Sequence, residues 1–283
     1  MTYLARLDAR MTETRTALCV GLDPDPAALP AGFSRDLAGV EAFGRLLVEA
    51  AGPHAAAVKA NLAFFEAWGS AGVAALERIR AAVPPEVPFI ADAKRGDIGS
   101  TSARHATAIF DILGADAVTA SPYLGEEAIA PLLDRADRFV YVLCRTSNPG
   151  AGELQDLVVS RPNQGRGSPE PMYLAVARRV EAWNATRGTV GLVVGATAPR
   201  EMEAIRAAAP ALPFLVPGVG AQGGDLDAVL SHGPATVEAA AGVPGGAVLV
   251  NISRAIASAG SESADVGQAI ADAAEGWALR LRV

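Results

Sequence analysis

Short runs of apolar residues recur along the chain, and segments with helical spacing of apolar and polar residues separate them. The runs are continuous rather than alternating, which is typical of parallel strands buried on both faces of a sheet. Each run therefore predicts one strand. The eight predicted strands are residues 17–22, 55–61, 88–94, 117–121, 139–144, 191–195, 213–217 and 247–251.

Helix signals lie between these strands. Residues 168–170 and 197–199 each place a capping residue before a first-turn proline. The last segment has one apolar helical face, formed by Val266, Ile270, Ala273, Trp277 and Leu281. Eight strand–helix units in a chain of this length indicate an α/β fold, a (β/α)8 TIM barrel that forms a single domain over residues 1–283. A doubly wound open sheet is the alternative topology.

Composition narrows the class of protein. The chain has 283 residues, of which 51% are hydrophobic, so a sizeable core is possible. Its net charge of −7 argues against a nucleic-acid binder, which would need a basic face. The longest uncharged stretch, residues 207–224, is interrupted by prolines, and the N-terminus has no apolar signal-peptide core. We therefore expect a cytoplasmic protein with no nucleic-acid and no membrane partner.

The cysteines and histidines indicate no metal site. Cys19 and Cys144 each lie in an apolar run, which predicts two reduced core thiols. His54, His105 and His232 are scattered along the chain, and we interpret all three as structural. No set of cysteine, histidine and carboxylate residues has the spacing of metal ligands, so the expected metal content is none.

Lysine usage singles out two residues. Of the 24 basic residues, 22 are arginine, and only Lys59 and Lys94 are lysine. Arginine is effectively always charged, whereas the compact ammonium of lysine can give up a proton. In a chain that uses arginine elsewhere, these two lysines are candidates for a role that arginine cannot fill.

Polar residues gather where the predicted strands end. In a (β/α)8 barrel the active site lies at the carboxyl ends of the strands, so the joint placement of these residues favours a functional role over a purely structural one. The residues at or just beyond these ends are Asp23, Lys59, Asn61, Asp92, Lys94, Asp97, Ser121, Thr146, Ser147, Gln222 and Arg254.

The densest polar segment is DAKRGDIGST, residues 92–101. Residues two apart on a strand point to the same side, so Asp92 and Lys94 should project together into the barrel mouth, with Asp97 close by. Lys59 from the neighbouring strand completes an alternating set of two cations and two anions, in which each group keeps its neighbours ionised. A salt-bridge network is the structural alternative. An ammonium held between carboxylates can also protonate a carbanion and stabilise it as it forms.

A second segment, PGVGAQGGD (residues 217–225), follows the seventh predicted strand. It contains G-x-G-x-x-G, but its late position and the absence of an acidic residue at the end of the next strand argue against a dinucleotide site. Its glycines fit better as a loop whose N–H groups approach a phosphate, because barrels commonly bind phosphate after strands 7 and 8. Arg254, after the eighth strand, would supply a bidentate cation.

Taken with the Lys59 strand, SNPG (147–150) and ISRAI (252–256), these segments resemble the orotidine 5′-phosphate decarboxylases, in particular the longer bacterial (type 2) subgroup. The resemblance extends from Asp23 to Arg254. It implies a lyase that converts orotidine 5′-monophosphate (orotidylate) to UMP in de novo pyrimidine biosynthesis without a cofactor. It also implies a homodimer with shared active sites.

The resemblance implies a role for each matching residue. Lys94 would protonate C6, Asp92 would lie beside the departing carboxylate, and Lys59 and Asp97 would complete the charged set, with Asp97 acting in the partner's site. Among the substrate-binding residues, Asp23 and Lys59 would hold ribose hydroxyls and Thr101 would assist from the partner. Ser147 would bond the pyrimidine edge, and Pro217 and Ile98 would line the apolar side of the base. Gln222 would bridge base and phosphate, and Arg254 would bind the phosphate.

One position departs from the family, and several other functions stay open. Shorter members have glycine directly before the phosphate arginine, whereas this chain has Ser253. The long segment 148–170 is expected to cover the pyrimidine. The nearest alternative is a metal-dependent sugar-phosphate decarboxylase or aldolase of the same barrel superfamily. A Schiff-base aldolase, a non-catalytic nucleotide-phosphate sensor and a nicotinamide oxidoreductase are further alternatives.

Overall fold

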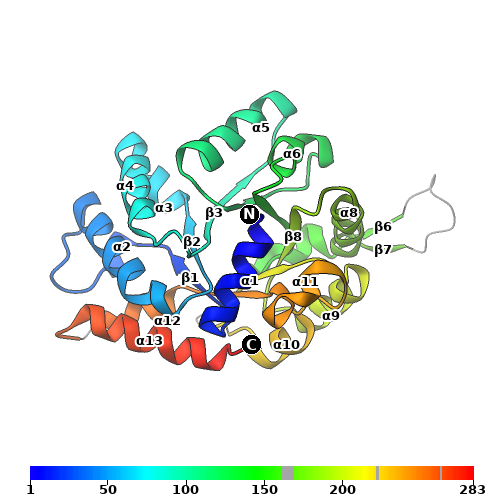
Figure 1. Cartoon of the computed structure of the whole chain (residues 1–283). Helices are drawn as coiled ribbons and strands as arrows, with labels where there is room; N and C mark the ends of the chain where they lie inside the picture. Colours follow the sequence, from blue (N-terminus) through cyan, green and yellow to red (C-terminus); the bar gives the residue numbers. More distant parts are fainter. Residues whose placement is uncertain (161–168, 221–222, 262) are drawn as a thin grey trace.

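The protein is a closed parallel barrel, described by a computed structural model for residues 1–160, 169–220, 223–261 and 263–283. Within these residues, eight parallel strands pair in chain order and the last pairs with the first (Figure 1). The eight predicted strands and the single (β/α)8 barrel are confirmed, and closure excludes the open sheet. The barrel strands are β1 (Leu18–Leu22), β2 (Ala57–Asn61), β3 (Phe89–Arg95), β4 (Ala117–Ala120), β5 (Phe139–Arg145), β8 (Val190–Val194), β9 (Phe214–Pro217) and β10 (Leu249–Ile252).

Helices surround the barrel between successive strands (Figure 1). The α-helices are α1 (Tyr3–Thr14), α2 (Leu37–Ala51), α3 (Ala63–Glu66), α4 (Gly69–Ala82), α5 (Gly99–Ala106), α6 (Glu126–Leu133), α7 (Gly152–Gln155), α8 (Met172–Arg187), α9 (Pro199–Ala208), α10 (Leu226–His232), α11 (Glu238–Gly242), α12 (Arg254–Ala257) and α13 (Val266–Arg280). The π-helix η3 (Thr107–Ile112) continues α5. Short 3-10 turns are η1 (Pro26–Ala28), η2 (Gly52–His54), η4 (Pro149–Ala151), η5 (Pro244–Ala247) and η6 (Ser258–Gly260).

One predicted helix start is wrong. The helix expected at Pro169 begins at Met172, and Glu170–Pro171 instead form a short strand, β7, antiparallel to β6 (Val158–Val159). Glu170 precedes a proline, and this disfavours the helical region for its backbone. By contrast, α9 starts at Pro199 as predicted, although its cap residue Ala198 offers no side-chain hydrogen bond.

The last helix packs as its apolar spacing predicts. In α13, Ile270 is fully buried, Val266, Ala273 and Trp277 are partly buried, and Leu281 is buried just beyond the helix end. This face lies against α2. Cys19 and Cys144 are free and buried, as predicted.

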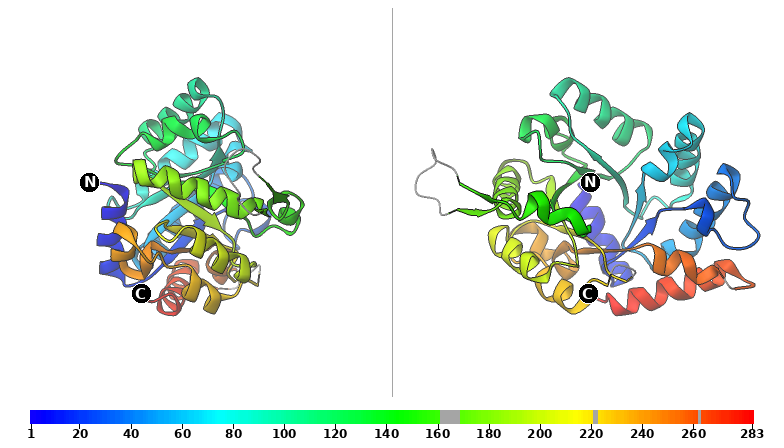
Figure 2. Two further views of the ribbon diagram at one scale, coloured as in Figure 1. Left: turned by 90° about the vertical axis from the view of Figure 1, so that its right-hand side faces the viewer. Right: turned by 180° about the vertical axis from the view of Figure 1, so that it is seen from behind.

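The first helix closes the amino end of the barrel. In Figure 1, α1 lies across the middle of the molecule, and the left panel of Figure 2 places it at the end away from the segment that follows β5. Tyr3 stacks on Phe139 at 4.9 Å between ring centroids, and its hydroxyl lies 3.1 Å from the hydroxyl of Tyr141. The remaining end of the barrel, where the strands finish, is therefore the one available for a site.

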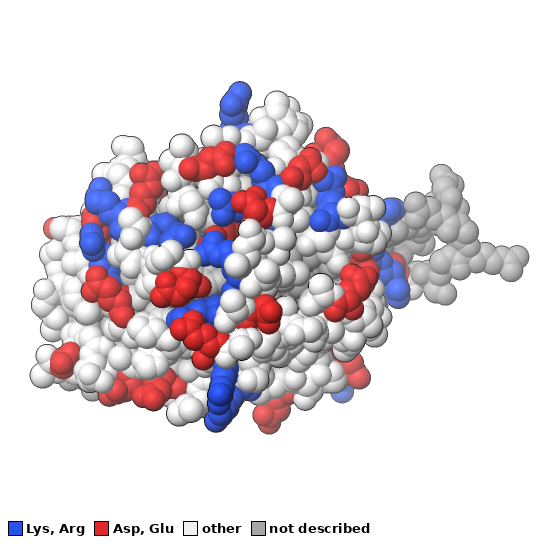
Figure 3. Space-filling view, viewed as in Figure 1, with Lys and Arg blue, Asp and Glu red and all other residues white. Residues whose placement is uncertain are grey.

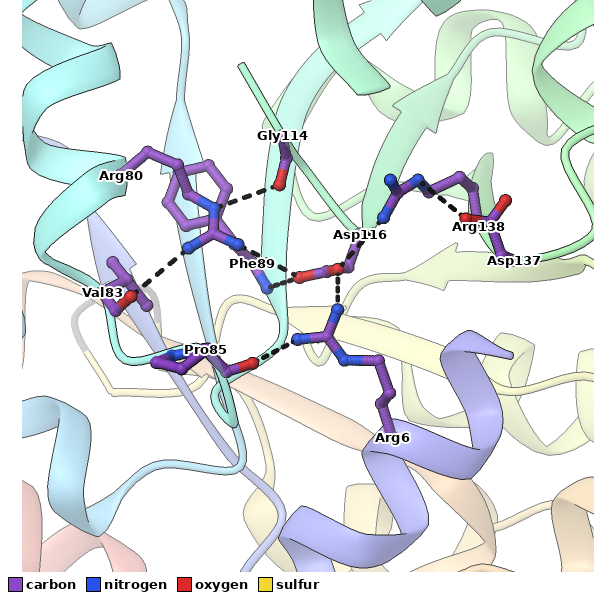
Figure 4. Close-up of polar contacts among 9 residues, drawn as sticks. All are labelled: Arg6, Arg80, Val83, Pro85, Phe89, Gly114, Asp116, Asp137 and Arg138. Carbon is purple, nitrogen blue, oxygen red and sulfur yellow. Dashed lines mark hydrogen bonds and ion pairs between the residues drawn. The ribbon is translucent and has the colours of Figure 1, made fainter. Parts of the chain in front are cut away.

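A buried carboxylate ties this closed end together (Figure 4). Asp116, just before β4, is 1% exposed and accepts a hydrogen bond of 2.8 Å from the backbone N–H of Phe89. Three guanidinium groups surround it: Arg6 of α1 in direct contact, Arg138 at 3.4 Å and Arg80 at 3.7 Å. Since Arg6 comes from α1, the network also fixes the helix that covers the barrel.

The surface at this closed end has mixed charge. Figure 3, viewed as Figure 1, shows basic and acidic side chains interspersed on this face. Among the described helices, none combines the length and the apolar character needed to span a membrane.

Candidate active site

Two adjoining cavities lie at the carboxyl ends of the strands. The right panel of Figure 2 shows the ribbon from this end of the barrel. The larger, of about 400 Å³, is lined by five of the predicted site residues, Lys59, Asp92, Lys94, Ser147 and Pro217. The smaller, of about 170 Å³, is lined by Asp23 and Arg254 together with Lys59, Asp92 and Pro217. The three shared residues form the boundary between the cavities.

Asp92 joins the two lysines at the centre of the site. Lys59 Nζ lies 3.0 Å from Asp92 Oδ2, and Lys94 Nζ lies 2.6 Å from Asp92 Oδ1. The side chains differ in exposure, at 6% for Lys59 and 49% for Lys94. One lysine is therefore a buried fixed charge, whereas the other remains in contact with solvent.

The neighbouring charges keep these groups ionised. Burial by itself would lower the pKa of Lys59, but the carboxylates of Asp23 and Asp92 outweigh it and raise that pKa above its ordinary value. For Asp92, burial would raise the pKa, but the ammonium groups of Lys59 and Lys94 lower it well below its usual range. Lys59 and Asp92 are thus both charged throughout the neutral pH range.

Lys94 reaches Asp92 through an irregular strand rather than by simple alternation. Ala91 pairs with Val118 and Arg95 pairs with Ala120, so the three residues Asp92 to Lys94 stand opposite the single residue Thr119. This bulge puts Lys94 in the left-handed region, at φ 49°. That conformation costs a non-glycine residue about 1 to 2 kcal/mol, so surrounding contacts must hold it.

Three predicted residues lie away from both cavities. Asp97, Ile98 and Thr101 follow β3 and line neither of them, although all three are described. The side chain of Asp97 accepts the N–H of Ile98 at 2.7 Å, and Ile98 is 62% exposed. Ile98, predicted to line the base with Pro217, therefore lies outside the cavities of its own chain.

The smaller cavity combines the cationic side chain of Arg254 with two oxygen atoms that lack hydrogen-bond partners in the described part of the chain. Among the described residues, the guanidinium of Arg254 has no hydrogen bond or ion pair, and the buried Oδ1 atoms of Asp23 and Asn251 have no hydrogen-bond partner. The glycine loop turns through positive φ at Gly218 (103°) and Gly220 (82°). Gln222, predicted to bridge base and phosphate, lies outside the described residues.

The family departure at Ser253 has a local explanation. A Cβ atom built on Gly21 of β1 would lie 2.6 Å from Ser253 Cβ, so glycine at position 21 leaves the space that this serine occupies. The serine is thus accommodated beside Arg254 by the neighbouring strand.

The larger cavity combines polar and apolar walls. Beyond Ser147, the start of the long segment after β5 contributes Asn148 and Gln155, and Gln155 Oε1 accepts the N–H of Thr146 at 2.9 Å. Residues 161–168 of that segment lie outside the described residues. Of the segment predicted to cover the pyrimidine, Asn148 and Gln155 are the residues that line the cavity. The apolar wall consists of Leu143, Val193, Leu215 and Pro217.

Three residues of the two cavity linings are not among those predicted from the sequence: Thr119 and Gln155 in the larger cavity and Asn251 in the smaller one. A signal existed for Thr119, since it is the one polar residue inside the apolar run 117–120. In the part of the chain that the structure describes, no group of three or more His, Cys, Asp or Glu residues could hold a metal ion.

A closed parallel barrel with a Lys–Asp–Lys centre at its carboxyl end defines this protein as a (β/α)8-barrel enzyme. The family model described as "Orotidine 5'-phosphate decarboxylase / HUMPS family" matches residues 16–269, and the chain belongs to this family.

Named proteins agree with this assignment. The orotidine 5′-phosphate decarboxylase of Thermomicrobium roseum is 45% identical over 282 residues, which cover 100% of this chain and 94% of that protein. The solved OMP decarboxylase of Leishmania donovani is 39% identical with a TM-score of 0.80, and each chain is covered completely. The UMP synthase of the same organism is 41% identical with a TM-score of 0.81, and the match covers 99% of this chain and 57% of that longer one.

Proposed function

We propose that this enzyme decarboxylates orotidine 5′-monophosphate to UMP in pyrimidine biosynthesis, in the cytoplasm and without a metal or organic cofactor. The observation that carries the proposal is the Lys59–Asp92–Lys94 set at the boundary between a cavity large enough for a base and a second cavity that contains Arg254. Family membership and the names of the relatives support the same reaction.

In the proposed mechanism, Lys94 is the acid. The bond between C6 and the carboxylate carbon breaks, CO2 departs, and the electron pair stays at C6. The ammonium of Lys94 stabilises that developing charge and then gives one proton to C6, which yields UMP. The neutral amine recovers its proton from water, which the half-exposed side chain can reach.

Asp92 and the residues that bind phosphate, ribose and base together lower the barrier to decarboxylation. A fixed carboxylate at Asp92 lies beside the departing carboxylate and disfavours the substrate relative to the transition state. Arg254 binds the phosphate far from the reacting carbon, so its binding energy offsets this repulsion. Asp23 and Lys59 hold the ribose, Ser147 and Pro217 contact the base, and Gln222 bridges base and phosphate.

The site is completed, in this proposal, by a second copy of the chain. Asp97, Ile98 and Thr101 lie outside the cavities of their own chain, at the start of α5. Tyr123 and Leu124, just before α6, are 82% and 54% exposed, and α5 packs against α6. An apolar surface of this kind is typical of a protein contact. We infer a twofold homodimer in which these three residues enter the partner's site.

Purified protein tests the reaction directly, through the loss of orotidylate absorbance with and without a chelator. We expect unchanged turnover with chelator, whereas a metal-dependent sugar-phosphate decarboxylase or aldolase would lose activity. Lys94→Arg keeps the charge but replaces a compact ammonium with a planar group that does not give up its proton, so turnover should vanish while the fold survives. Turnover within about tenfold of wild type would exclude Lys94 as the proton donor.

Subunit mixing tests the shared site. Lys94→Ala and Asp97→Ala should each be inactive alone. After subunit exchange at equal amounts, about half of the dimers are mixed and each has one intact site, so about a quarter of wild-type activity should return. Mixing Lys94→Ala with Asp92→Ala is the control, since both residues come from the same chain and no intact site can form. A mixture of the first pair that stays inactive after demonstrated exchange would place Asp97 in its own chain's site.

A further inference from the structure

Thr119 of β4 lies beside the larger cavity, directly opposite the bulge that holds Asp92 and Lys94. Its side chain is buried, at 2% exposure, and it lines the cavity. The register of β3 and β4 places it alone against the three residues of the bulge. On the β4 side of the bulge, Thr119 is therefore the residue placed to fix its shape.

The Thr119 hydroxyl makes two hydrogen bonds to this bulge. Thr119 Oγ1 accepts the backbone N–H of Lys94 at 3.0 Å, and it donates to Asp92 Oδ1 at 2.8 Å. The same Asp92 oxygen accepts Lys94 Nζ at 2.6 Å. One hydroxyl thus contacts both the backbone of the lysine and the carboxylate that pairs with its ammonium.

These hydrogen bonds act on a residue whose own conformation and packing do not hold it in place, Lys94. Lys94 has a positive φ, which its side chain disfavours, and its side chain is half exposed, so packing does not fix it. In a regular parallel ladder its N–H would bond a strand carbonyl, whereas here it bonds the Thr119 side chain. The hydroxyl therefore replaces a ladder bond that the bulge removes.

We propose that Thr119 is a positioning residue that holds the Lys94 backbone in its left-handed conformation and aims the Lys94 ammonium and the Asp92 carboxylate at the reacting carbon. This inference rests on the proposed role of Lys94 as proton donor. Thr119 acts through Lys94 and Asp92, and within the described residues its hydroxyl makes no hydrogen bond to Asp23, Lys59 or Arg254, the groups proposed to bind ribose and phosphate. Its loss should therefore lower kcat with little change in KM.

Thr119→Val tests the proposal, because valine keeps the β-branched shape and removes the hydroxyl. We expect kcat to fall about 100-fold, the size of effect that a misplaced catalytic group produces. KM should change by less than about threefold, and Thr119→Ser, which restores the hydroxyl, should return kcat to within about fivefold of wild type. Should the valine variant fail to fold, Thr119→Ala provides the same measurement with a smaller side chain.

Thr189→Val is the matched control. Thr189 is also buried, its hydroxyl donates to the carbonyl of Leu133 at 2.7 Å, and it lies just before β8 at the amino end of the barrel. This variant should lower the melting temperature about as much as Thr119→Val but leave kcat unchanged. Equal kcat losses in the two variants would show a general structural effect and overturn the proposal.

The same experiment separates failure of the inference from failure of the proposed function. If Lys94→Ala is inactive while Thr119→Val keeps kcat within about threefold of wild type, Lys94 needs no support from Thr119 and the inference is wrong. If Lys94→Ala is itself active, the proton-donor assignment fails first. A loss in Thr119→Val that serine does not rescue would also overturn the proposal, because the hydroxyl would not be the cause.

Discussion

The two lysines of this chain share one carboxylate but differ in burial, and this contrast predicts different effects on stability. Lys59 and Lys94 both bond Asp92, at 3.0 and 2.6 Å, while their side chains are 6% and 49% exposed. Replacing each with methionine keeps the length of the side chain and removes the charge. The shorter ion pair belongs to Lys94, so distance alone would rank Lys94 as the more important residue for stability.

Burial reverses that ranking. Lys59→Met leaves Asp23 and Asp92 in a buried site without their central cation, and Asp23 Oδ1 already lacks a hydrogen-bond partner. Removing one partner of a buried pair costs about 3 to 5 kcal/mol, and we expect about 3 kcal/mol here because Lys94 still neutralises Asp92. Lys94→Met removes a half-exposed pair that water screens, so we expect a cost of about 1 kcal/mol or less.

The difference between wild type and Lys59→Met should also depend on pH. The pKa of Asp92 is lowered by folding, so its contribution is present above its unfolded value, near 3.9, and is lost as the pH falls through the lower folded value. Without Lys59, that pKa rises and less stability is lost on acidification. The pKa of Lys59 is raised, so its contribution is lost only above about pH 10.4. The gap should therefore be largest near neutral pH and should narrow below about pH 5.

Urea unfolding of wild type and both variants at pH 7 and pH 3, at one fixed protein concentration, measures these quantities. Equal free energies of unfolding for the two variants at pH 7 would refute the burial argument. A Lys59→Met deficit relative to wild type that does not change between pH 7 and pH 3 would show that Asp92 is not the group to which Lys59 couples.

Two further variants separate the active end of the barrel from the closed end. Arg254→Ala should lower kcat/KM by a factor that corresponds to about 3 to 4 kcal/mol of transition-state stabilisation, the value of two charge-assisted hydrogen bonds to phosphate. Added guanidinium should restore part of this loss. An unchanged kcat/KM would mean that the phosphate binds elsewhere. Asp116→Asn keeps an acceptor for the N–H of Phe89 but leaves Arg6, Arg80 and Arg138 without their anion, so the free energy of unfolding should fall by about 3 kcal/mol with kcat unchanged. A stability loss below about 1 kcal/mol would show that the three arginines are sufficiently solvated without Asp116.

The strands were predictable because each is buried on both faces and its apolar run is continuous. The long segment after β5 was harder, because its structure depends on local backbone rules that hydrophobicity does not show. Ser168-Pro169-Glu170 has the composition of a helix start, but Pro171 disfavours helix at Glu170 and the helix begins at Met172. The amino-end network around Asp116 joins four segments, and no sequence pattern links them.

At the site, residue types were predictable but the detailed geometry was not. The prediction that Asp92 and Lys94 meet assumed a regular strand, whereas the structure reaches the same contact through a bulge. A bulge is a property of two strands together, so the sequence of β3 alone could not show it. Thr119 stands out in the sequence as the one polar residue of its apolar run, but its role depends on its register against β3, which the sequence does not show.

The contrast between the two lysines also bears on which of them can act as the acid. Asp23 and Asp92 raise the pKa of Lys59, and its buried side chain has little access to water, so it is both a weak acid and slow to regain a proton. Lys94 pairs with one carboxylate and stays half exposed, so it can exchange protons with solvent after each turnover. Lys59 therefore suits a fixed charge that keeps Asp92 ionised, and Lys94 suits the group that gives its proton to the substrate. Exposure of the proton donor leaves its side chain less constrained, and the bulge opposite Thr119 supplies the positioning that burial supplies for Lys59.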